Sequence, residues 1–232
     1  MGSAETEVEN YFRQNIFHGK YGPVRRSGKL VMERQTVPNN PDSLHRVCAP
    51  QPDNSYGYDR YAAFDLSKQI QLANIANMNV NSDYLLYPFL VVEFKADGPQ
   101  SSGSLWTATN QCLGGASASA NMIEGLDSLL HSRSLLDVPQ SSNITFSFAL
   151  SGTEGRLHIT WRDKDHILYT QRVQNYMLQR PDELQLFRRH FRNVIDWGKD
   201  KRLPVITKAL DSIVESNRVL MSAQDHSACK RR

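Results

Sequence analysis

A carboxylate and an ammonium group stand two residues apart at the end of an apolar run, at Glu93 and Lys95. Side chains of a strand alternate between its faces, so both groups point the same way while Phe94 points to the other face. The run before them, residues 85–92, is so uniformly apolar that we expect a strand covered on both faces. A buried charge is costly unless a partner or a metal neutralises it, so the pair predicts a functional site. The alternative is a strand that ends in solvent with two harmless charges.

Another acidic residue, Asp53, follows Pro52 at the start of a second expected strand, residues 53–58. Proline suits a strand start because it has no N–H to give to the ladder. Apolar residues at helical spacing predict a connecting helix over residues 61–78, which leads into the apolar strand. Asp83 is a rival for the first acidic position. It would lie on or just before the same strand as the glutamate, up to about 33 Å away if extended, so it is a poor co-ligand.

The other expected elements complete an α/β (α+β) fold with a mixed central sheet. Gly114 and Gly115 interrupt the middle of a long helix, where each costs about 1 kcal/mol relative to alanine, so they predict a close approach of that helix to the sheet. A turn-rich segment, residues 96–104, is expected to be a mobile loop. The remaining expected elements are a helix over 5–17, a strand over 29–37, the long helix over 105–131, strands over 143–151, 155–162 and 166–175, and helices over 181–197 and 203–221.

Three blocks of sequence together resemble the PD-(D/E)XK nuclease superfamily, and more narrowly the nuclease-like domains common in filamentous fungi. The resemblance covers about residues 5–200 and implies a restriction-endonuclease-like core, in which the N-terminal helix and the Gly114-Gly115 helix pack against a mixed sheet. The blocks are Pro52-Asp53-x-x-Tyr56-Gly57-Tyr58, the segment 87–95 with Glu93-Phe94-Lys95 at its end, and Asn110-Gln111-Cys112-Leu113-Gly114-Gly115.

The resemblance implies Mg²⁺-dependent hydrolysis of phosphodiester bonds in nucleic acid, with DNA expected before RNA and Mn²⁺ as a substitute metal. Mg²⁺ prefers oxygen ligands and keeps several waters, so carboxylates from two adjacent strands are a sufficient anchor. We assign this role to Asp53 and Glu93. The main-chain carbonyl of Phe94 is a further ligand that the resemblance implies. Lys95 would hold or polarise the attacking water and stabilise the charge of the transition state.

The resemblance also implies two further site residues, a glutamine and a carboxylate of the N-terminal helix. Gln111 follows the Glu-x-Lys strand on the next helix, where many members of the superfamily place a glutamine that orients the lysine or the scissile phosphate. The alternative is a polar residue satisfied near a helix start. A carboxylate of the N-terminal helix often completes the metal site, and Glu9 or Glu5 could serve; with Glu7 also present, the choice stays open.

The charge balance permits a nucleic-acid partner without requiring one. The formal net charge is +3 and the isoelectric point is near 8.7. Basic residues gather near the C-terminal end, and we expect four of them to contact phosphates, which gives salt-sensitive affinity without sequence selectivity. The alternative is a solvated helix face. The four are Arg188, Arg189, Arg192 and Lys199.

A different interpretation keeps the fold and drops the chemistry. The chain would then be a catalytically inactive binding or effector module that acts through nucleic acid or a protein partner. The intact set of Asp53, Glu93 and Lys95 favours catalysis, because a binding module has no need of buried charge. Enzymes that cut both strands are commonly dimers, so a homodimer is a further alternative.

One domain accounts for the whole length of 232 residues. We expect this nuclease-like domain over residues 1–222, with a core over 5–178 and C-terminal helices over 181–222, and a flexible basic tail over 223–232. No segment approaches the roughly 18 to 20 apolar residues of a membrane span, and the N-terminus lacks a signal peptide. The three cysteines lack metal-ligand spacing. These features predict an intracellular protein, nuclear or cytoplasmic, with reduced thiols and no membrane partner.

A phosphate-loop-like segment, residues 22–29, is rejected. It has one residue too many between Gly22 and Gly28, and Leu30 stands where the motif has serine or threonine.

Overall fold

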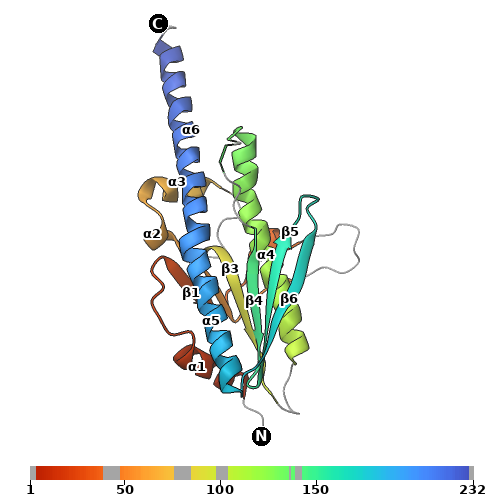
Figure 1. Ribbon diagram of the computed structural model, residues 1–232. Coiled ribbons are helices and arrows are strands. Elements are labelled where there is room, and N and C mark those ends of the chain that lie inside the picture. Colours follow the sequence, from red (N-terminus) through yellow and green to blue (C-terminus); the bar gives the residue numbers. More distant parts are fainter. Residues whose placement is uncertain are drawn as a thin grey trace.

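A mixed six-stranded sheet organises the chain, and its strands lie side by side in chain order (Figure 1). The computed structural model describes residues 4–38, 48–75, 85–97, 104–135, 137–138 and 143–229. Neighbouring strands are antiparallel except β3 and β4, which are parallel and connected by a crossover through α4. The predicted α/β class with a mixed central sheet flanked by helices is confirmed. The strands are β1 (Val24–Gly28), β2 (Asn54–Asp59), β3 (Leu85–Phe94), β4 (Thr145–Leu150), β5 (Glu154–Arg162) and β6 (Leu168–Met177).

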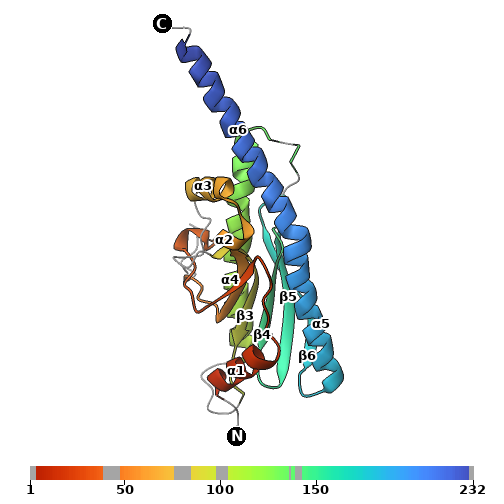
Figure 2. The same cartoon turned by 90° about the vertical axis from the view of Figure 1, so that its left-hand side faces the viewer.

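Helices cover both faces of the sheet. Figure 2 shows the sheet between α4 (Leu105–Ser132) on one side and α5 (Pro181–Trp197) on the other. A π-helical turn, Gly198–Arg202, continues α5 directly into α6 (Leu203–Cys229). The smaller helices are α1 (Glu5–Asn15), α2 (Arg60–Ala63), α3 (Leu66–Asn74) and a 3₁₀ turn at Arg34–Thr36. No helix among the described residues is long and apolar enough to cross a membrane.

The apolar run predicted as a doubly covered strand is β3, and every one of its residues is buried. Its two faces meet different partners. Val91 packs under α4 with Met122, whereas the ring of Phe94 faces the other side and lies 5.6 Å from the ring of Phe12 on α1. This alternation fixes which residues can share a site, because consecutive residues of β3 face opposite layers.

Aromatic packing holds α1 and α5 against the sheet. Phe17 lies 4.5 Å from Phe191, and Phe187 lies 5.0 Å from Phe148, measured between ring centroids. Offset or edge-on ring pairs at these distances add to the free energy of burying the apolar area. The face of α5 that meets the sheet is therefore aromatic, and its outer face is left to polar and basic residues.

The glycines of α4 mark the closest approach of that helix to the sheet, as the sequence predicts. A Cβ atom added to Gly115 would lie 3.0 Å from Val91 Cγ1 and 3.1 Å from Pro52 Cγ. A Cβ atom on Gly114 would meet only Pro50, at 3.5 Å, which is ordinary contact. Only Gly115 is therefore needed for the close approach, and it packs beside the residue that precedes Asp53.

The predicted strand over residues 29–37 is wrong. Strand β1 ends at Gly28, and Lys29 adopts a left-handed φ of 53° that turns the chain. The backbone N–H of Met32 then donates to the carbonyl of Pro50, and Arg34–Thr36 forms the 3₁₀ turn. The alternation that predicted a strand belongs to a loop that packs Met32 under α4 and is tied to that helix by a hydrogen bond from Asn121 to the Thr36 carbonyl.

The helix predicted over residues 61–78 is two helices. Asp65 separates α2 from α3, because its side chain accepts a hydrogen bond from the N–H of Lys68 at 3.1 Å and caps the start of α3. At the other end of the chain, α6 continues to Cys229, so the backbone of residues 223–229, expected as a flexible tail, is helical. Residues 76–78, Asp83, most of the expected loop over 96–104, and residues 230–232 lie outside the described residues.

We predict opposite effects for alanine at the two adjacent glycines of α4. Gly114→Ala should raise the free energy of unfolding by up to about 1 kcal/mol, because alanine is the better helix former and the space is open. Gly115→Ala should lower it by about 1–3 kcal/mol, because the new methyl group pushes on Val91 and Pro52. Urea denaturation of both variants measures the difference. Equal effects would contradict the close approach.

Candidate functional site

Asp53 and Glu93 form a pair of buried carboxyl groups across two strands. The antiparallel register places Asn54 opposite Val92, so one further step puts Asp53 opposite Glu93. Asp53 is 8% exposed and Glu93 is 2% exposed. A carboxyl oxygen of Asp53 accepts a hydrogen bond from the backbone N–H of Phe94 at 2.8 Å, which ties the aspartate to the end of β3. The structure thus brings together the two acidic residues that the sequence singled out.

The pKa of Glu93 is raised to about 9, mainly because the side chain is buried and also because the Asp53 carboxylate lies near it. The ammonium group of Lys95 offsets part of this rise. Without a cation, Glu93 therefore keeps its proton at neutral pH and shares a hydrogen bond with Asp53. A bound cation could take the place of this proton and allow both carboxyl groups to ionise.

Lys95 completes the set on the side of α1. It is 9% exposed, and its ammonium nitrogen lies 3.2 Å from a carboxylate oxygen of Glu5. The Glu5 charge also contributes to the raised pKa of Glu93. The first turn of α1 therefore delivers a third carboxylate to the candidate site.

Glu9, the other helix carboxylate considered from the sequence, lies one turn further along α1. Its carboxylate is 3.6 Å from the ammonium nitrogen of Lys29. The backbone N–H of Lys29 in turn donates to the carbonyls of Pro52 and Asp53, at 3.0 and 3.2 Å. Glu9 is therefore paired with Lys29, whose backbone is bonded to Asp53, whereas Glu5 is paired with Lys95. Glu7 instead accepts a hydrogen bond from the N–H of Ala4 at the helix start.

The two strand carboxylates suit a hard divalent cation that takes few protein ligands, rather than a metal enclosed by protein side chains. Among the residues that the structure describes, no group of three histidine, cysteine, aspartate or glutamate side chains could enclose a metal ion. Mg²⁺ does not need such a cage, because it keeps several of its waters and commonly takes only one or two protein carboxylates. Asp53 and Glu93 would hold it, and binding would displace the proton from Glu93.

Gln111 lies at the edge of this site without a direct partner in it. It is exposed on α4, and the next residue, Cys112, is fully buried against the backbone of Glu93 and the side chain of Ser147. Burial raises the pKa of the Cys112 thiol, and the Glu93 charge adds to the rise. The structure thus puts an inert thiol, rather than the glutamine, in contact with the pair. Sequence reasoning missed this neighbour, although Cys112 lies one turn before Gly115 on the face of α4 that meets the sheet.

The four predicted phosphate contacts are not beside the carboxylates. Arg188, Arg189 and Arg192 lie on α5, which covers the sheet face opposite to α4. Arg189 and Arg192 are exposed, whereas Arg188 is partly buried. Lys199 lies 3.7 Å from Asp196 and 3.5 Å from Asp200, so neighbouring carboxylates already offset its charge.

Comparison with known families finds one match. A family model described as a domain of unknown function, DUF7924, matches residues 12–210, which is most of the chain. No curated protein and no solved structure matches.

The raised pKa of Glu93 predicts a pH-dependent stability of the metal-free protein. The group holds its proton to about pH 9 when folded but loses it near 4.5 when unfolded, so the free energy of unfolding falls as the pH rises between these values. Glu93→Gln removes this dependence. In EDTA, the variant should gain about 1 kcal/mol per pH unit over the native chain between pH 5 and pH 8.

Denaturant titration at the two pH values measures this gain. The matched control is Glu215→Gln, which changes an exposed glutamate on α6. The same pH profile in both variants would contradict a protonated Glu93.

Proposed function

The chain belongs to the DUF7924 family, and we propose that it hydrolyses phosphodiester bonds of nucleic acid with Mg²⁺ as cofactor, DNA being the expected substrate. The observation that carries the proposal is the buried pair of Asp53 and Glu93 with Lys95 beside it. A structural role alone does not explain why two carboxyl groups lie opposite each other in a buried sheet, because apolar residues there would be more stable. The resemblance to PD-(D/E)XK nucleases adds a reaction that uses this set.

Asp53 and Glu93 would hold the cation from adjacent strands, with the Phe94 carbonyl as a further ligand. Bound Mg²⁺ would lower the pKa of an attacking water and offset the charge that grows on the phosphoryl oxygens. The hydrogen bond from the Phe94 N–H keeps the Asp53 carboxylate in one orientation before the cation arrives.

Lys95 would act on the substrate as a point charge. It shares the strand face of Glu93, and Glu5 holds its ammonium group at 3.2 Å. An ammonium group in this place can donate hydrogen bonds to a phosphoryl oxygen or to the attacking water. Glu5 is then a positioning residue, because it acts on the reaction through the lysine.

The alternative is a catalytically inactive module of the same fold that binds nucleic acid or a protein. One observation favours it: the exposed arginines of α5 lie on the sheet face opposite to the carboxylates. A substrate held by Arg189 and Arg192 alone would lie on the sheet face opposite to Glu93. The test below separates the two proposals.

Cleavage of supercoiled plasmid, single-stranded DNA and RNA in Mg²⁺, Mn²⁺ or EDTA tests the catalytic proposal. We predict cutting that depends on the metal and that Glu93→Gln and Lys95→Gln each reduce by at least about 100-fold. Glu215→Gln and Lys208→Gln, which change exposed residues of α6, make the same charge changes and should leave cutting unaltered. Cutting that survives in EDTA or in Glu93→Gln would reject the proposed mechanism, and no cutting of any substrate would favour the binding module.

The salt dependence of DNA binding tests the role of α5. Each phosphate contact contributes about 0.9 to the slope of log affinity against log salt for duplex DNA. Arg189→Gln should reduce the slope by about this amount, whereas Lys199→Gln should leave it unchanged because Asp196 and Asp200 offset that charge. Fluorescence anisotropy at several salt concentrations measures both. An equal change in the two variants would contradict the assignment.

A further inference from the structure

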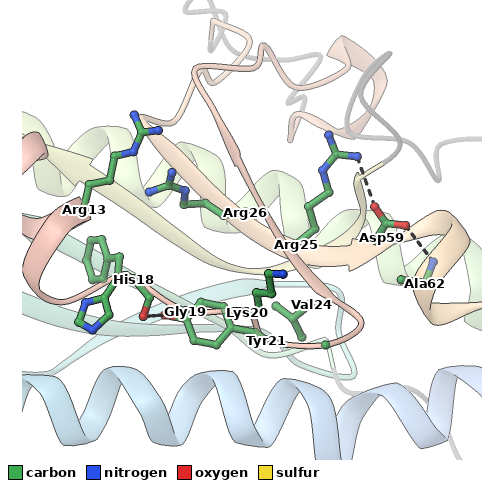
Figure 3. Close-up of a pocket in the computed structure, with 12 residues that line it drawn as sticks. Arg13, His18, Gly19, Lys20, Tyr21, Val24, Arg25, Arg26, Asp59 and Ala62 are labelled. Atoms are coloured by element: carbon green, nitrogen blue, oxygen red, sulfur yellow. Dashed lines mark hydrogen bonds and ion pairs between the residues drawn. The ribbon is translucent and has the colours of Figure 1, made fainter.

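A hollow of about 560 Å³ opens beside the edge strand β1 (Figure 3). Its wall comes from the end of α1, the loop that follows, and β1 itself. Four of its lining side chains are cations: Arg13, Lys20, Arg25 and Arg26. Arg25 and Arg26 are neighbours on β1, whereas Arg13 belongs to α1 and Lys20 to the loop between them, so the turn of the chain after α1 brings the four together.

One of these charges is neutralised within the hollow and three are not. Arg25 points toward Asp59, with 3.4 Å between a guanidinium nitrogen and a carboxylate oxygen, as Figure 3 shows. Asp59 also accepts the N–H groups of Tyr61 and Ala62 at the start of α2. Within the part of the chain that the structure describes, no carboxylate forms an ion pair with Arg13, Lys20 or Arg26. The hollow is therefore a concave site with uncompensated positive charge, where the electrostatic attraction of an anion is strong.

Tyr21 lines this hollow, and the buried Tyr56 packs behind it. Tyr21 is half-buried in its wall; burial raises the pKa of its hydroxyl, and the charges of Arg192 and Arg26 lower it in part. Its ring lies 6.3 Å from the ring of Tyr56, which is fully buried. The Arg26 guanidinium lies beside the Tyr56 hydroxyl and interacts with it, which ties this cation to the wall of the hollow.

We propose that this hollow binds the phosphate group of a nucleotide. Arg13, Lys20 and Arg26 would contact the phosphate oxygens, and Arg192 of α5, whose charge acts on Tyr21, would add to the positive potential. The half-buried ring of Tyr21 offers a face for a base. The volume is in the range of sites that enclose small ligands. The same chemistry suits a free nucleotide or one nucleotide of a strand.

The site lies apart from the proposed metal centre. Arg26 lies opposite Tyr56 on the neighbouring strand, so their side chains share one face of the sheet, and the ring of Tyr56 packs against Phe191 of α5. Glu93 instead lies against Cys112 of α4. Arg26 and Glu93 thus face opposite layers of the sheet, and the hollow lies at the edge strand β1. Phosphate binding here does not rest on the proposed nuclease activity, and the two can fail separately.

Binding to the full chain in EDTA tests the proposal, because no metal-dependent cutting occurs there. Calorimetry would measure the dissociation constants of inorganic phosphate and of a 5′-mononucleotide, and fluorescence anisotropy that of a labelled single strand. We expect Arg13→Gln and Arg26→Gln each to weaken binding of all these ligands about tenfold. Arg172→Gln, which removes an exposed arginine of β6, is the matched control and should change binding less than about twofold.

Two further variants separate the parts of the site. Arg26→Lys keeps the charge beside Tyr56 and should restore most of the affinity that Arg26→Gln loses. Tyr21→Leu should weaken the mononucleotide but not inorganic phosphate, because only the nucleotide has a base to stack. A mononucleotide that competes with the labelled strand identifies a nucleic-acid groove, and tight mononucleotide binding with weak strand binding identifies a free-nucleotide site. No binding, or equal losses in Arg13→Gln and Arg172→Gln, would overturn the proposal.

Discussion

Two carboxyl groups lie opposite each other in a buried part of the sheet, and the packing around them must accommodate this pair. Asp53 and Glu93 stand opposite each other where β2 begins and β3 ends, and both are buried. In such surroundings two like charges cannot both persist without compensation, so either a proton or a cation must be held between them. The close approach of Gly115 to Pro52 and the hydrogen bond from Phe94 to Asp53 both keep the pair in place.

The sheet separates the carboxyl pair from the exposed arginines of α5. The pair lies under α4, whereas α5 covers the other face, and the cationic hollow lies at the edge strand β1. This division follows from the alternation of side chains in a strand, which sends Glu93 and Phe94 to opposite layers. A nucleic-acid strand that used both faces would have to pass an edge of the sheet, and β1 is the edge strand that the hollow adjoins.

Local patterns predicted much of this arrangement, and the failures have physical reasons. The apolar run of β3 and Gly115 of α4 carry their own signal, because burial and close packing restrict residue type directly. The strand over residues 29–37 was wrong because a single left-handed residue, Lys29, ends β1 early, and alternation alone does not reveal such a turn. The roles of Glu5 and Glu9 depend on how α1 packs against other segments of the chain, which no local pattern records. The gathering of cations beside β1 depends on the path of the loop between α1 and β1.

A crystal structure of the full chain, grown with Mn²⁺ and measured at a wavelength where manganese scatters anomalously, would show directly whether the carboxyl pair holds a metal. We expect an anomalous peak between the side chains of Asp53 and Glu93, about 2.0–2.3 Å from an oxygen of each, with the remaining positions filled by water or the Phe94 carbonyl. A map without that peak, in which the two carboxyl groups remain hydrogen-bonded to each other at high Mn²⁺ concentration, would contradict it.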